Sequence, residues 1–542
     1  MSRASVLANA VPPLVARRRA IEAEPLPDGL WPLVEAAAAE TPDRVALDFF
    51  EDGETLTFAG LRERANRLAA GLAGIGIGRG MHVAVMLPNR LAFPVTWLAL
   101  ARLGAVMVPM NLAYTAREIA YVVADGDVEW AIVDRDLLPV FDPPPPGLAA
   151  GRIVAVGGTA GDHADWDGLV AAGDAAFAPD PPPGADDLLN IQYTSGTTGL
   201  PKGCMLTQRY WVTAGLVNAR RDGRTYRRLL ASTPFFYMDP QWLLVMALWQ
   251  RATLFVARRQ SASRFMGWVR DHGIHFTLLP AVVAKQPPDP RDRDHELVRV
   301  NVYGLPRDEH AALEARFDVV AREAYGMTEI GSGMFMPIEA TDMVGSGSCG
   351  MPSPFREARI VDETGRPVPP GSAGELEIRG PGILAGYYNK PEATAAALRD
   401  GWFRTGDLFR QDDRGYFFIV GRIKDMIRRA GENIAAREVE AVLTGIDAVE
   451  EAAAVPVPDP VRGEEVLAFV VLRPGFDRAA VTPDHILAHC RANLAPFKVP
   501  RYLAYRDAFP KTPSDKIAKR LLAEPGADLR AGAWDRVEAR WR

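Results

Sequence analysis

Apolar strand-like runs alternate with helical stretches through the first part of the chain, and this alternation constrains the fold most. Strands are expected at residues 45–49, 83–87, 105–109 and 129–133. The strand at 45–49 is expected to pair with a strand at 55–58 in a hairpin. Parallel strands need a crossover helix between them, so strands alternating with helices of about 10 residues predict a doubly wound, parallel α/β sheet. Helices are expected at 31–39, from 60 onward, and at 91–103, 116–124, 207–219 and 263–272, with further strands at 229–233, 252–256 and 275–279.

The later half of the chain is richer in strands. Runs at 358–361, 374–378 and 416–419 have strand character, and a new pattern of helices and strands follows. A chain of 542 residues is also too long for one compact core. We therefore expect an irregular N-terminal segment (1–30) in which Arg17-Arg18-Arg19 is solvated, a large N-terminal domain (31–421) and a small C-terminal domain (422–542).

Composition excludes several classes of function. The net charge of −6 argues against a nucleic acid as partner. The three cysteines, Cys204, Cys349 and Cys490, are few and widely spaced, which favours a reducing compartment, the cytoplasm, with no disulfide framework. The most apolar window, residues 91–110, contains two prolines and an arginine, so a buried helix and strand are predicted there instead of a transmembrane segment. The N-terminal residues have no signal-peptide pattern.

One stretch, residues 193–203, concentrates hydroxyl groups, glycines and a lysine. Its sequence is Tyr-Thr-Ser-Gly-Thr-Thr-Gly-Leu-Pro-Lys-Gly. Hydroxyl and backbone N–H groups bind phosphate oxygens, and glycine lets the backbone approach them closely. Lys202 adds a positive charge. The stretch lacks the Gly-Lys-Ser/Thr ending of a Walker A loop, because Pro201 precedes the lysine. A polar surface turn is the other interpretation of such a cluster.

Further motifs follow in order, and together they carry a resemblance. They are Tyr325-Gly326-Met327-Thr328-Glu329, Thr405-Gly406-Asp407, Gly421-Arg422 and the C-terminal stretch from Pro510 to Ile517 that contains Lys516. With the stretch at 193–203, they make the chain similar to the adenylate-forming enzymes, which include acyl-CoA synthetases, peptide-synthetase adenylation domains and luciferases. The resemblance runs over roughly residues 30–522. It implies αβα layers and a small β-barrel in the N-terminal domain, with a mobile α+β C-terminal domain.

The resemblance also implies which residues act. Mg²⁺ would be held by Glu329, and the catalytic residues would be Lys516, Thr328 and Glu329. The residues implied in binding ATP and AMP are Thr194, Ser195, Gly196, Thr197, Thr198, Lys202, Gly304, Tyr325, Gly326, Asp407 and Arg422. Those implied in the domain hinge and in binding coenzyme A are Lys424, Gly431 and Glu432.

The chain departs from the family pattern at three positions. Asp515 stands where a glycine usually precedes the catalytic lysine, Tyr303 replaces a glycine near the adenine site, and Tyr237 replaces a histidine beside the acyl site. Residues 234–241 and 497–503 look nearest to the carnitine/crotonobetaine–CoA ligase branch. The acyl pocket is predicted to include Phe235, Tyr237, Pro280, Val282 and Gly331.

The activity that the resemblance implies is an ATP-dependent acid–CoA ligase. A small or medium carboxylic acid would attack the α-phosphorus of ATP to give acyl-AMP and pyrophosphate, and the thiolate of coenzyme A would then take the acyl group. Two alternatives stay open, namely transfer to a carrier-protein thiol and a non-catalytic nucleotide-binding relative. A homodimer is also left open.

Overall fold

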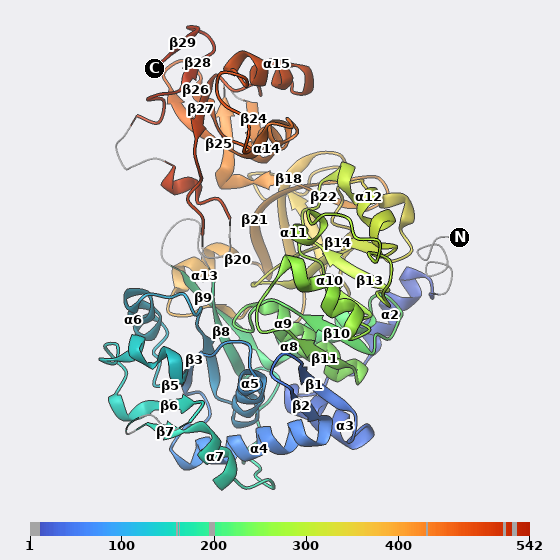
Figure 1. Ribbon diagram of the computed structural model, residues 1–542, viewed down its shortest axis with the longest axis vertical. Coiled ribbons are helices and arrows are strands. Elements are labelled where there is room, and N and C mark those ends of the chain that lie inside the picture. Colours follow the sequence, from blue (N-terminus) through green and yellow to red (C-terminus); the bar gives the residue numbers. More distant parts are fainter. Residues whose placement is uncertain are drawn as a thin grey trace. The chain divides into compact units, whose positions relative to one another are not determined.

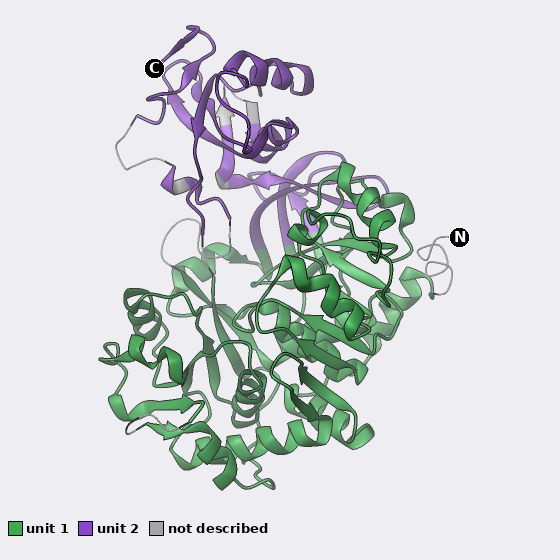
Figure 2. Cartoon of the chain, viewed as in Figure 1, with its two compact units in different colours: residues 1–194, 201–358, 378–403 green, residues 195–200, 359–377, 404–542 purple. Residues whose placement is uncertain are grey.

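The computed structural model describes residues 11–158, 161, 163–194, 201–429, 432–512, 516–522 and 528–542, with the backbone alone at 424, 428, 432, 433 and 520. The described residues form two compact units, coloured separately in Figure 2. The first comprises described parts of Met1–Thr194, Pro201–Ala358 and Ile378–Phe403. The second comprises described parts of Arg359–Glu377 and Arg404–Arg542.

The first unit contains two large sheets, both visible in Figure 1. One has eight strands, in the spatial order β19 (Gly386–Tyr387), β9 (Lys202–Thr207), β8 (Leu188–Thr194), β4 (Val106–Pro109), β3 (His82–Met86), β5 (Trp130–Asp134), β6 (Ile153–Val156) and β7 (Ala164–Asp165). The strands from β8 to β7 are parallel, whereas β9 and β19 are antiparallel to their neighbours. Every residue of β3 and β5 is buried, as expected for parallel strands covered on both faces.

The other large sheet has nine strands. Their order is β16 (Met351–Pro352), β15 (Gly331–Phe335), β14 (Val320–Met327), β13 (Arg299–Val302), β12 (Phe276–Leu278), β10 (Arg228–Ala231), β11 (Thr253–Val256), β1 (Val45–Phe49) and β2 (Glu54–Thr57). The run from β14 to β1 is parallel, and β15, β16 and β2 add antiparallel pairs at the two edges.

Helices of the first unit pack between and around these sheets. They are α2 (Leu14–Ala23), α3 (Leu30–Glu40), α4 (Phe58–Gly74), α5 (Ala92–Leu103), α6 (Ala116–Asp125), α7 (Trp166–Ala172), α8 (Gln208–Arg220), α9 (Met238–Gln250), α10 (Ala262–Asp271), α11 (Ala281–Ala284), α12 (Arg307–Phe317) and α13 (Pro391–Ala397). Helix α3 contacts α5, α8 and α9, α8 also contacts α9, and α8 contacts a strand of each sheet, β9 and β15. These four helices therefore form a layer shared by the two sheets.

A small five-stranded sheet follows in the later half of the chain. Its strands run in the order β17 (Glu357–Val361), β18 (Ala373–Arg379), β21 (Trp402–Gln411) and β20 (Leu398–Arg399), with β22 (Phe417–Arg422) paired to β21. The pairs of β21 with β20 and with β22 are antiparallel. This sheet occupies the part of the chain for which the sequence predicted strand-rich structure.

The rest of the second unit is built on a seven-stranded sheet. Its order is β24 (Glu432–Ala435), β23 (Met426–Arg429), β26 (Gly463–Leu472), β27 (Tyr502–Arg506), β28 (Trp534–Asp535) and β29 (Arg540–Trp541), with β25 (Val449–Asp459) paired to β26. Helices α14 (Ala436–Thr444) and α15 (Pro483–Asn493) contact each other. Buried side chains of both helices, such as Val439 and Leu487, join a core with those of β26, such as Val470.

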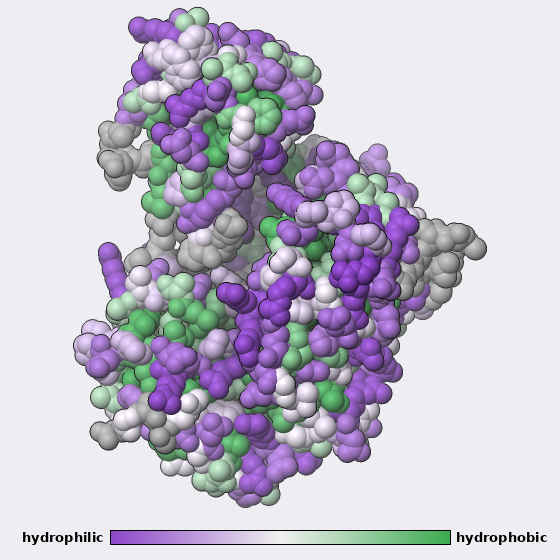
Figure 3. All heavy atoms as spheres, viewed as in Figure 1, coloured by the Kyte–Doolittle hydropathy of each residue, from purple (hydrophilic) through white to green (hydrophobic). Residues whose placement is uncertain are grey.

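The predicted alternation of strands and helices is confirmed, and so is the mixed α/β class with a large N-terminal and a small C-terminal part. Hydrophilic and hydrophobic residues are interspersed over the face of the first unit seen in Figure 3. Among the described residues, none of the helices has the length and apolar character needed to cross a bilayer.

The irregular N-terminal segment predicted for residues 1–30 is wrong at residues 14–23, which form α2. Arg17 is also not solvated, because only 5% of it is exposed. Its Nε donates to the carbonyl oxygen of Arg221 at 2.7 Å, and its Nη2 donates to Glu339 at 3.0 Å. A three-residue run of arginines gives no sign of such distant partners, so the sequence could not single out the buried member.

The substitution Arg17→Met is expected to destabilise the first unit. It removes hydrogen bonds to the carbonyl groups of Arg221 and Pro12 and leaves Glu339 without its cation, a loss of about 1–3 kcal/mol. Differential scanning fluorimetry should therefore give a lower apparent Tm. Arg19→Met, two positions away on an exposed residue, is the matched control and should leave Tm unchanged. Equal Tm values for both variants would contradict the anchoring role of Arg17.

Candidate active site

The polar stretch at 193–203 lies between two paired strands. β8 ends at Thr194 and β9 begins at Lys202, and these two residues face each other in the antiparallel ladder. The hydroxyl group of Thr194 donates to the carbonyl oxygen of Lys202 at 3.5 Å. Ser195, Gly196, Thr197 and Thr198 lie outside the described residues. The structure therefore places the two ends of the predicted phosphate loop side by side, at the carboxyl end of β8.

Lys202 and Glu329 are joined by the side chain of Tyr387. The Lys202 ammonium group lies 4.4 Å from the centre of the Tyr387 ring, a cation–π contact. The hydroxyl group of the same tyrosine donates to Oε1 of Glu329 at 2.9 Å. Tyr387 reaches this position because β19 pairs with β9, where Tyr387 faces Cys204. Two predicted site residues, far apart in the sequence, are thus brought to one cluster.

The Glu329 carboxylate is 7% exposed, and its charge depends on this cluster. Burial raises the pKa of Glu329, whereas the hydrogen bond from Tyr387 and the positive charge of Lys202 lower it. Burial also raises the pKa of Cys204, so this thiol stays protonated near neutral pH. Cys204 is fully buried, as a cysteine that packs like a small apolar side chain would be.

The Tyr325–Glu329 motif forms the end of β14 and the turn into β15. A Cβ atom added at Gly326 would lie 2.5 Å from the carbonyl oxygen of Gly331, so only glycine fits between the two strands. Gly331 has φ = 63°, a conformation that favours glycine. The Tyr210 hydroxyl group donates to the carbonyl oxygen of Thr328 at 2.9 Å. The motif is therefore a constrained hairpin that fixes the position of Glu329.

A network of buried amide side chains fixes the segment 235–237 before α9. Gln241 donates to the carbonyl oxygens of Phe235 at 2.9 Å and Tyr237 at 3.1 Å, and Gln192 donates to that of Phe236 at 2.8 Å. Asn190 on β8 donates to the side chain of Gln241 at 2.9 Å. The strand that precedes the predicted phosphate loop is thus tied directly to the segment predicted to border the acyl site.

The five residues predicted for the acyl pocket differ in their surroundings. The ring of Phe235 is fully buried, 5.4 Å from that of Phe93. The Tyr237 hydroxyl group accepts a hydrogen bond from Asn111 at 3.3 Å. Pro280 precedes α11, on which Val282 is 47% exposed. Gly331 is the first residue of β15. The assignment of these five residues to the acyl pocket stays a prediction.

Gly304, the predicted adenine-site residue, follows β13. Its N–H group donates to Oε2 of Glu323 at 3.1 Å, and the N–H group of Leu305 donates to Oε1 at 2.8 Å. Gly304 has φ = 65°. One carboxylate of β14 therefore holds the turn that follows the neighbouring strand.

In the second unit, Asp407 and Arg422 face each other. They are paired in the antiparallel ladder of β21 and β22, and Arg422 Nε lies 2.9 Å from Asp407 Oδ1. Asp407 is 3% exposed. The turn before it is held by Glu375, whose carboxylate accepts from the N–H group of Gly406 at 3.2 Å and from Arg404. The structure thus brings together the two residues that the resemblance assigns to the ribose.

Lys516 belongs to the same unit. Its backbone N–H group donates to the Thr512 hydroxyl group at 3.1 Å, and the N–H group of Thr512 donates to the Lys516 carbonyl oxygen at 2.7 Å. The residue as a whole is exposed. Desolvation of its ammonium group and the positive charge of Arg422 lower the pKa of Lys516, and Asp407 acts in the opposite direction. Lys516 therefore lies within electrostatic range of the Asp407–Arg422 pair.

Only some of the residues predicted for the domain hinge and for binding coenzyme A are among the described residues. Lys424 lies in the short 3₁₀ helix Ile423–Asp425 that follows β22, and Glu432 begins β24. Gly431 and Asp515 lie outside the described residues. Among the described residues, no group of three or more His, Cys, Asp or Glu side chains could hold a metal ion. A single carboxylate such as Glu329 still suits Mg²⁺, which is often held by one or two carboxylates together with substrate phosphates.

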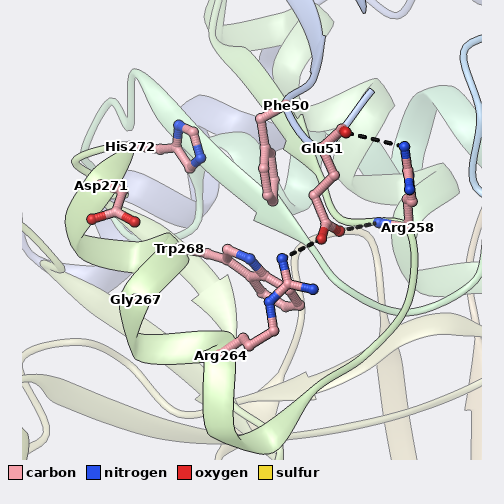
Figure 4. Close-up of a pocket in the computed structure, with 8 residues that line it drawn as sticks. All are labelled: Phe50, Glu51, Arg258, Arg264, Gly267, Trp268, Asp271 and His272. Atoms are coloured by element: carbon pink, nitrogen blue, oxygen red, sulfur yellow. Dashed lines mark hydrogen bonds and ion pairs between the residues drawn. The ribbon is translucent and has the colours of Figure 1, made fainter. Parts of the chain in front are cut away.

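The first unit also has a concave region away from these residues, drawn in Figure 4. It is lined by Phe50, Glu51, Arg258, Arg264, Gly267, Trp268, Asp271 and His272. Its two arginines are paired with carboxylates, Arg264 with Glu51 and Arg258 with Asp52. None of the site residues predicted from the sequence lines this region.

Comparison with known proteins identifies the family. The family model described as AMP-binding enzyme matches residues 34–388, and that of the AMP-binding enzyme C-terminal domain matches residues 438–516. The chain belongs to the AMP-binding enzyme family. The sulfoacetate–CoA ligase of Cupriavidus necator is 36% identical over 508 residues, covering 91% of this chain and 97% of that protein. The crotonobetaine/carnitine–CoA ligase of Salmonella paratyphi A is 33% identical over 505 residues, covering 89% and 96%.

Solved structures agree. The crystal structure of ATP-bound MatB from Rhodopseudomonas palustris is 27% identical in sequence and superposes with a TM-score of 0.79. The match covers 90% of this chain and 97% of that chain. These findings confirm the family resemblance predicted from the motifs, with crotonobetaine/carnitine–CoA ligases among the relatives. This AMP-binding enzyme is an ATP-dependent acid–CoA ligase of the AMP-forming type, and it uses ATP, Mg²⁺ and coenzyme A.

Sequence reasoning missed several residues of the site. Tyr387 stands in the stretch Gly386-Tyr387-Tyr388, and nothing in the sequence pattern indicates that it contacts Glu329. Tyr210 lies in a helix, where it looks like an ordinary apolar-face residue. Asn190 and Gln241 gave a weak signal, because an amide inside an otherwise apolar run must find a hydrogen-bond partner if it is buried. Only the fold supplies the identity of that partner.

The substitution Tyr387→Phe is expected to shift the pH dependence of the enzyme. It removes the hydrogen bond that stabilises the Glu329 carboxylate, so the pKa of Glu329 should rise further. If the ionised form is required, the acid limb of kcat/KM for ATP moves to higher pH by about one unit, while the alkaline plateau is retained. Tyr388→Phe, whose hydroxyl group donates to exposed Asp127, is the control. Identical profiles for the two variants would contradict the role of Tyr387.

Proposed function

We propose that acid activation takes place at the cluster of Lys202, Glu329 and Tyr387, with Lys516 assisting from the C-terminal domain. The observation that carries this proposal is the buried Glu329 carboxylate, which interacts with Lys202 where β8 and β9 flank the loop 195–200. A buried carboxylate beside a cation, at the carboxyl end of a parallel strand, suits the binding of phosphate and its metal ion.

In the first half-reaction, an oxygen of the substrate carboxylate attacks the α-phosphorus of ATP, and the bond to pyrophosphate breaks. Negative charge gathers on the phosphoryl oxygens, where fixed cations and N–H donors stabilise it. We assign this role to Lys202, Thr328 and Lys516, together with the hydroxyl groups of Thr194, Ser195, Thr197 and Thr198. Mg²⁺ bound through Glu329 would neutralise further phosphate charge.

Nucleotide orientation is assigned to a second set of residues. Asp407 would accept hydrogen bonds from the ribose hydroxyl groups, with Arg422 beside it, and Gly304 would lie against the adenine. In the second half-reaction the coenzyme A thiolate attacks the acyl carbonyl carbon of acyl-AMP, and AMP leaves. Catalysis by positioning and charge stabilisation needs no nucleophile from the protein.

We further propose residues 31–421 and 422–542 as the two functional domains, with Lys424 as the hinge. In support, β22 belongs to the small sheet and β23 to the seven-stranded sheet, and only the short helix containing Lys424 separates them. Gly431 and Glu432 would then serve thioester formation, after the C-terminal domain has rotated.

The cytoplasm is proposed as the compartment, because Cys204, Cys349 and Cys490 are all buried thiols. A homodimer is proposed as the assembly, and light scattering can test it by measuring the molar mass in solution.

The acid itself is proposed to be a small or medium carboxylic acid. AMP formation dependent on ATP and coenzyme A should be measured across short-chain, branched, aromatic, alicyclic, dicarboxylic and betaine-type acids. A marked preference for one class is the expected result. Activity with a carrier protein but not with free coenzyme A would favour the carrier-protein alternative. ATP binding without turnover of any acid would favour a non-catalytic relative.

Lys516→Ala is expected to separate the two half-reactions. Loss of the positive charge should slow adenylation, measured as pyrophosphate release, by about 100- to 1000-fold. Thioester formation from supplied acyl-AMP should persist, because the lysine is assigned to the first step only. Lys511→Ala is the control, since this exposed lysine of the same stretch pairs with Glu451. Equal loss of both half-reactions in Lys516→Ala would refute the assignment.

A further inference from the structure

One face of α6 contacts a residue on each side of the predicted phosphate loop. Tyr121 and Asp125 stand four residues apart on this helix, a spacing that puts two side chains on the same face. The Tyr121 hydroxyl group donates to the carbonyl oxygen of Pro201 at 2.8 Å. The Tyr193 hydroxyl group donates to Oδ2 of Asp125 at 2.9 Å. The helix therefore holds the chain both before and after the loop.

Both contacts lie next to residues to which we assign phosphate binding. Tyr193 directly precedes Thr194, and Pro201 directly precedes Lys202. The rings of Tyr121 and Tyr193 also meet edge to face, with their centres 6.3 Å apart. Because each hydrogen bond is one residue away from a phosphate-binding group, its loss would shift that group relative to the nucleotide.

Asp125 also joins the loop to the strand that carries Tyr387. The ammonium group of Lys390 pairs with Oδ1 of Asp125, while Oδ2 accepts from Tyr193. Lys390 stands three residues after Tyr387, whose ring contacts Lys202. The Asp125 side chain is 9% exposed. One nearly buried carboxylate therefore ties β8 to the segment that follows β19.

The side chain of Tyr193 packs closely against two glycines. A Cβ atom added at Gly126, directly after α6, would lie 3.1 Å from the Tyr193 hydroxyl oxygen. A Cβ atom added at Gly203 would lie 3.2 Å from the Tyr193 ring. Glycine at both positions gives the ring the room that it needs to reach Asp125.

Asp125 does not serve the stability of its own helix. It is the last residue of α6, at the end where the backbone carbonyl groups carry partial negative charge. A carboxylate is disfavoured at this end, and aspartate also has a low helix propensity. A residue that breaks a local rule in this way is expected where function requires it. Its partners outside the helix, Tyr193 and Lys390, therefore account for the position of Asp125.

We propose that Tyr121 and Asp125 are positioning residues of the adenylation step, which hold Thr194 and Lys202 against the β- and γ-phosphates of ATP. The inference rests on the proposed site, in which Thr194 and Lys202 bind phosphate. Tyr121 acts through the backbone just before Lys202, and Asp125 acts through the strand just before Thr194. Loss of either contact weakens the binding of the two phosphates that leave as pyrophosphate. AMP lacks these phosphates, so its binding is unaffected.

The first test measures the affinity of the full chain for ATP and for AMP by isothermal titration calorimetry with Mg²⁺, in the absence of acid and coenzyme A. Tyr121→Phe removes one neutral hydrogen bond and should weaken ATP binding about 3- to 10-fold. Asp125→Asn removes a charged acceptor and its ion pair, and should weaken ATP binding about 10- to 100-fold. The affinity for AMP should stay unchanged in both variants.

Tyr388→Phe is the matched control for this titration. It also removes a hydroxyl group that donates to a carboxylate in the turn after α6, that of Asp127, and it should change neither affinity. Asp125→Glu keeps the charge and should recover part of the ATP affinity that Asp125→Asn loses. Equal losses of ATP and AMP affinity, as a merely structural role predicts, would overturn the inference, and so would ATP affinities equal to that of the wild type. If Asp125→Asn does not fold, Tyr121→Phe decides alone.

The second test follows the two half-reactions. At ATP concentrations below KM, pyrophosphate release should slow in Tyr121→Phe and Asp125→Asn by the same factors as the ATP affinity. Thioester formation from supplied acyl-AMP should keep the wild-type rate, and equal slowing of both half-reactions would overturn the inference. A wild-type enzyme that forms no AMP with any acid would refute acid activation at this site. The inference would then still be decided by the ATP and AMP affinities of the variants.

Discussion

Parallel pairing of buried strands is the constraint on which the rest of the structure depends. Strands such as β3 and β13 are covered on both faces, so their backbone groups must be satisfied within the sheet and their side chains must be apolar or paired. The polar residues to which we assign ligand binding are then left to the segments at the ends of the strands. Thr194 ends β8, Tyr303 and Gly304 follow β13, and the Glu329 turn follows β14.

Buried polar groups connect these segments to one another. The amides of Asn190 and Gln241 tie β8 to the start of α9, and Glu323 of β14 holds the turn after β13. Each contact satisfies a group that would otherwise be buried without a partner, so it stabilises the fold and positions the site together. Arg221 is held in a similar way, by the side chains of Asn301 and Ser332.

The sequence predicted the strand and helix pattern well where burial was simple. Residues 83–87 and 130–133, which supply most of β3 and β5, are apolar. Helix α6 follows Thr115, its N-cap, which forms a capping box with Glu118. The prediction from sequence was wrong at α2 (Leu14–Ala23), because this Pro- and Arg-containing segment has no clear periodicity of apolar residues. Arg17 is buried only because Arg221 and Glu339, hundreds of residues away, supply its hydrogen bonds.

The sequence by itself determined the family, the α/β class and the order of the motifs, because glycines, hydroxyl residues and charged residues at fixed spacing are local properties of the chain. Tertiary structure alone decided which side chains meet. Tyr387 reaches Glu329 through the pairing of β19 with β9, and Arg221 reaches Ser332 through the packing of α8 near β15. The physical reason is that burial, and with it the charge balance around a group, depends on neighbours that are distant in sequence.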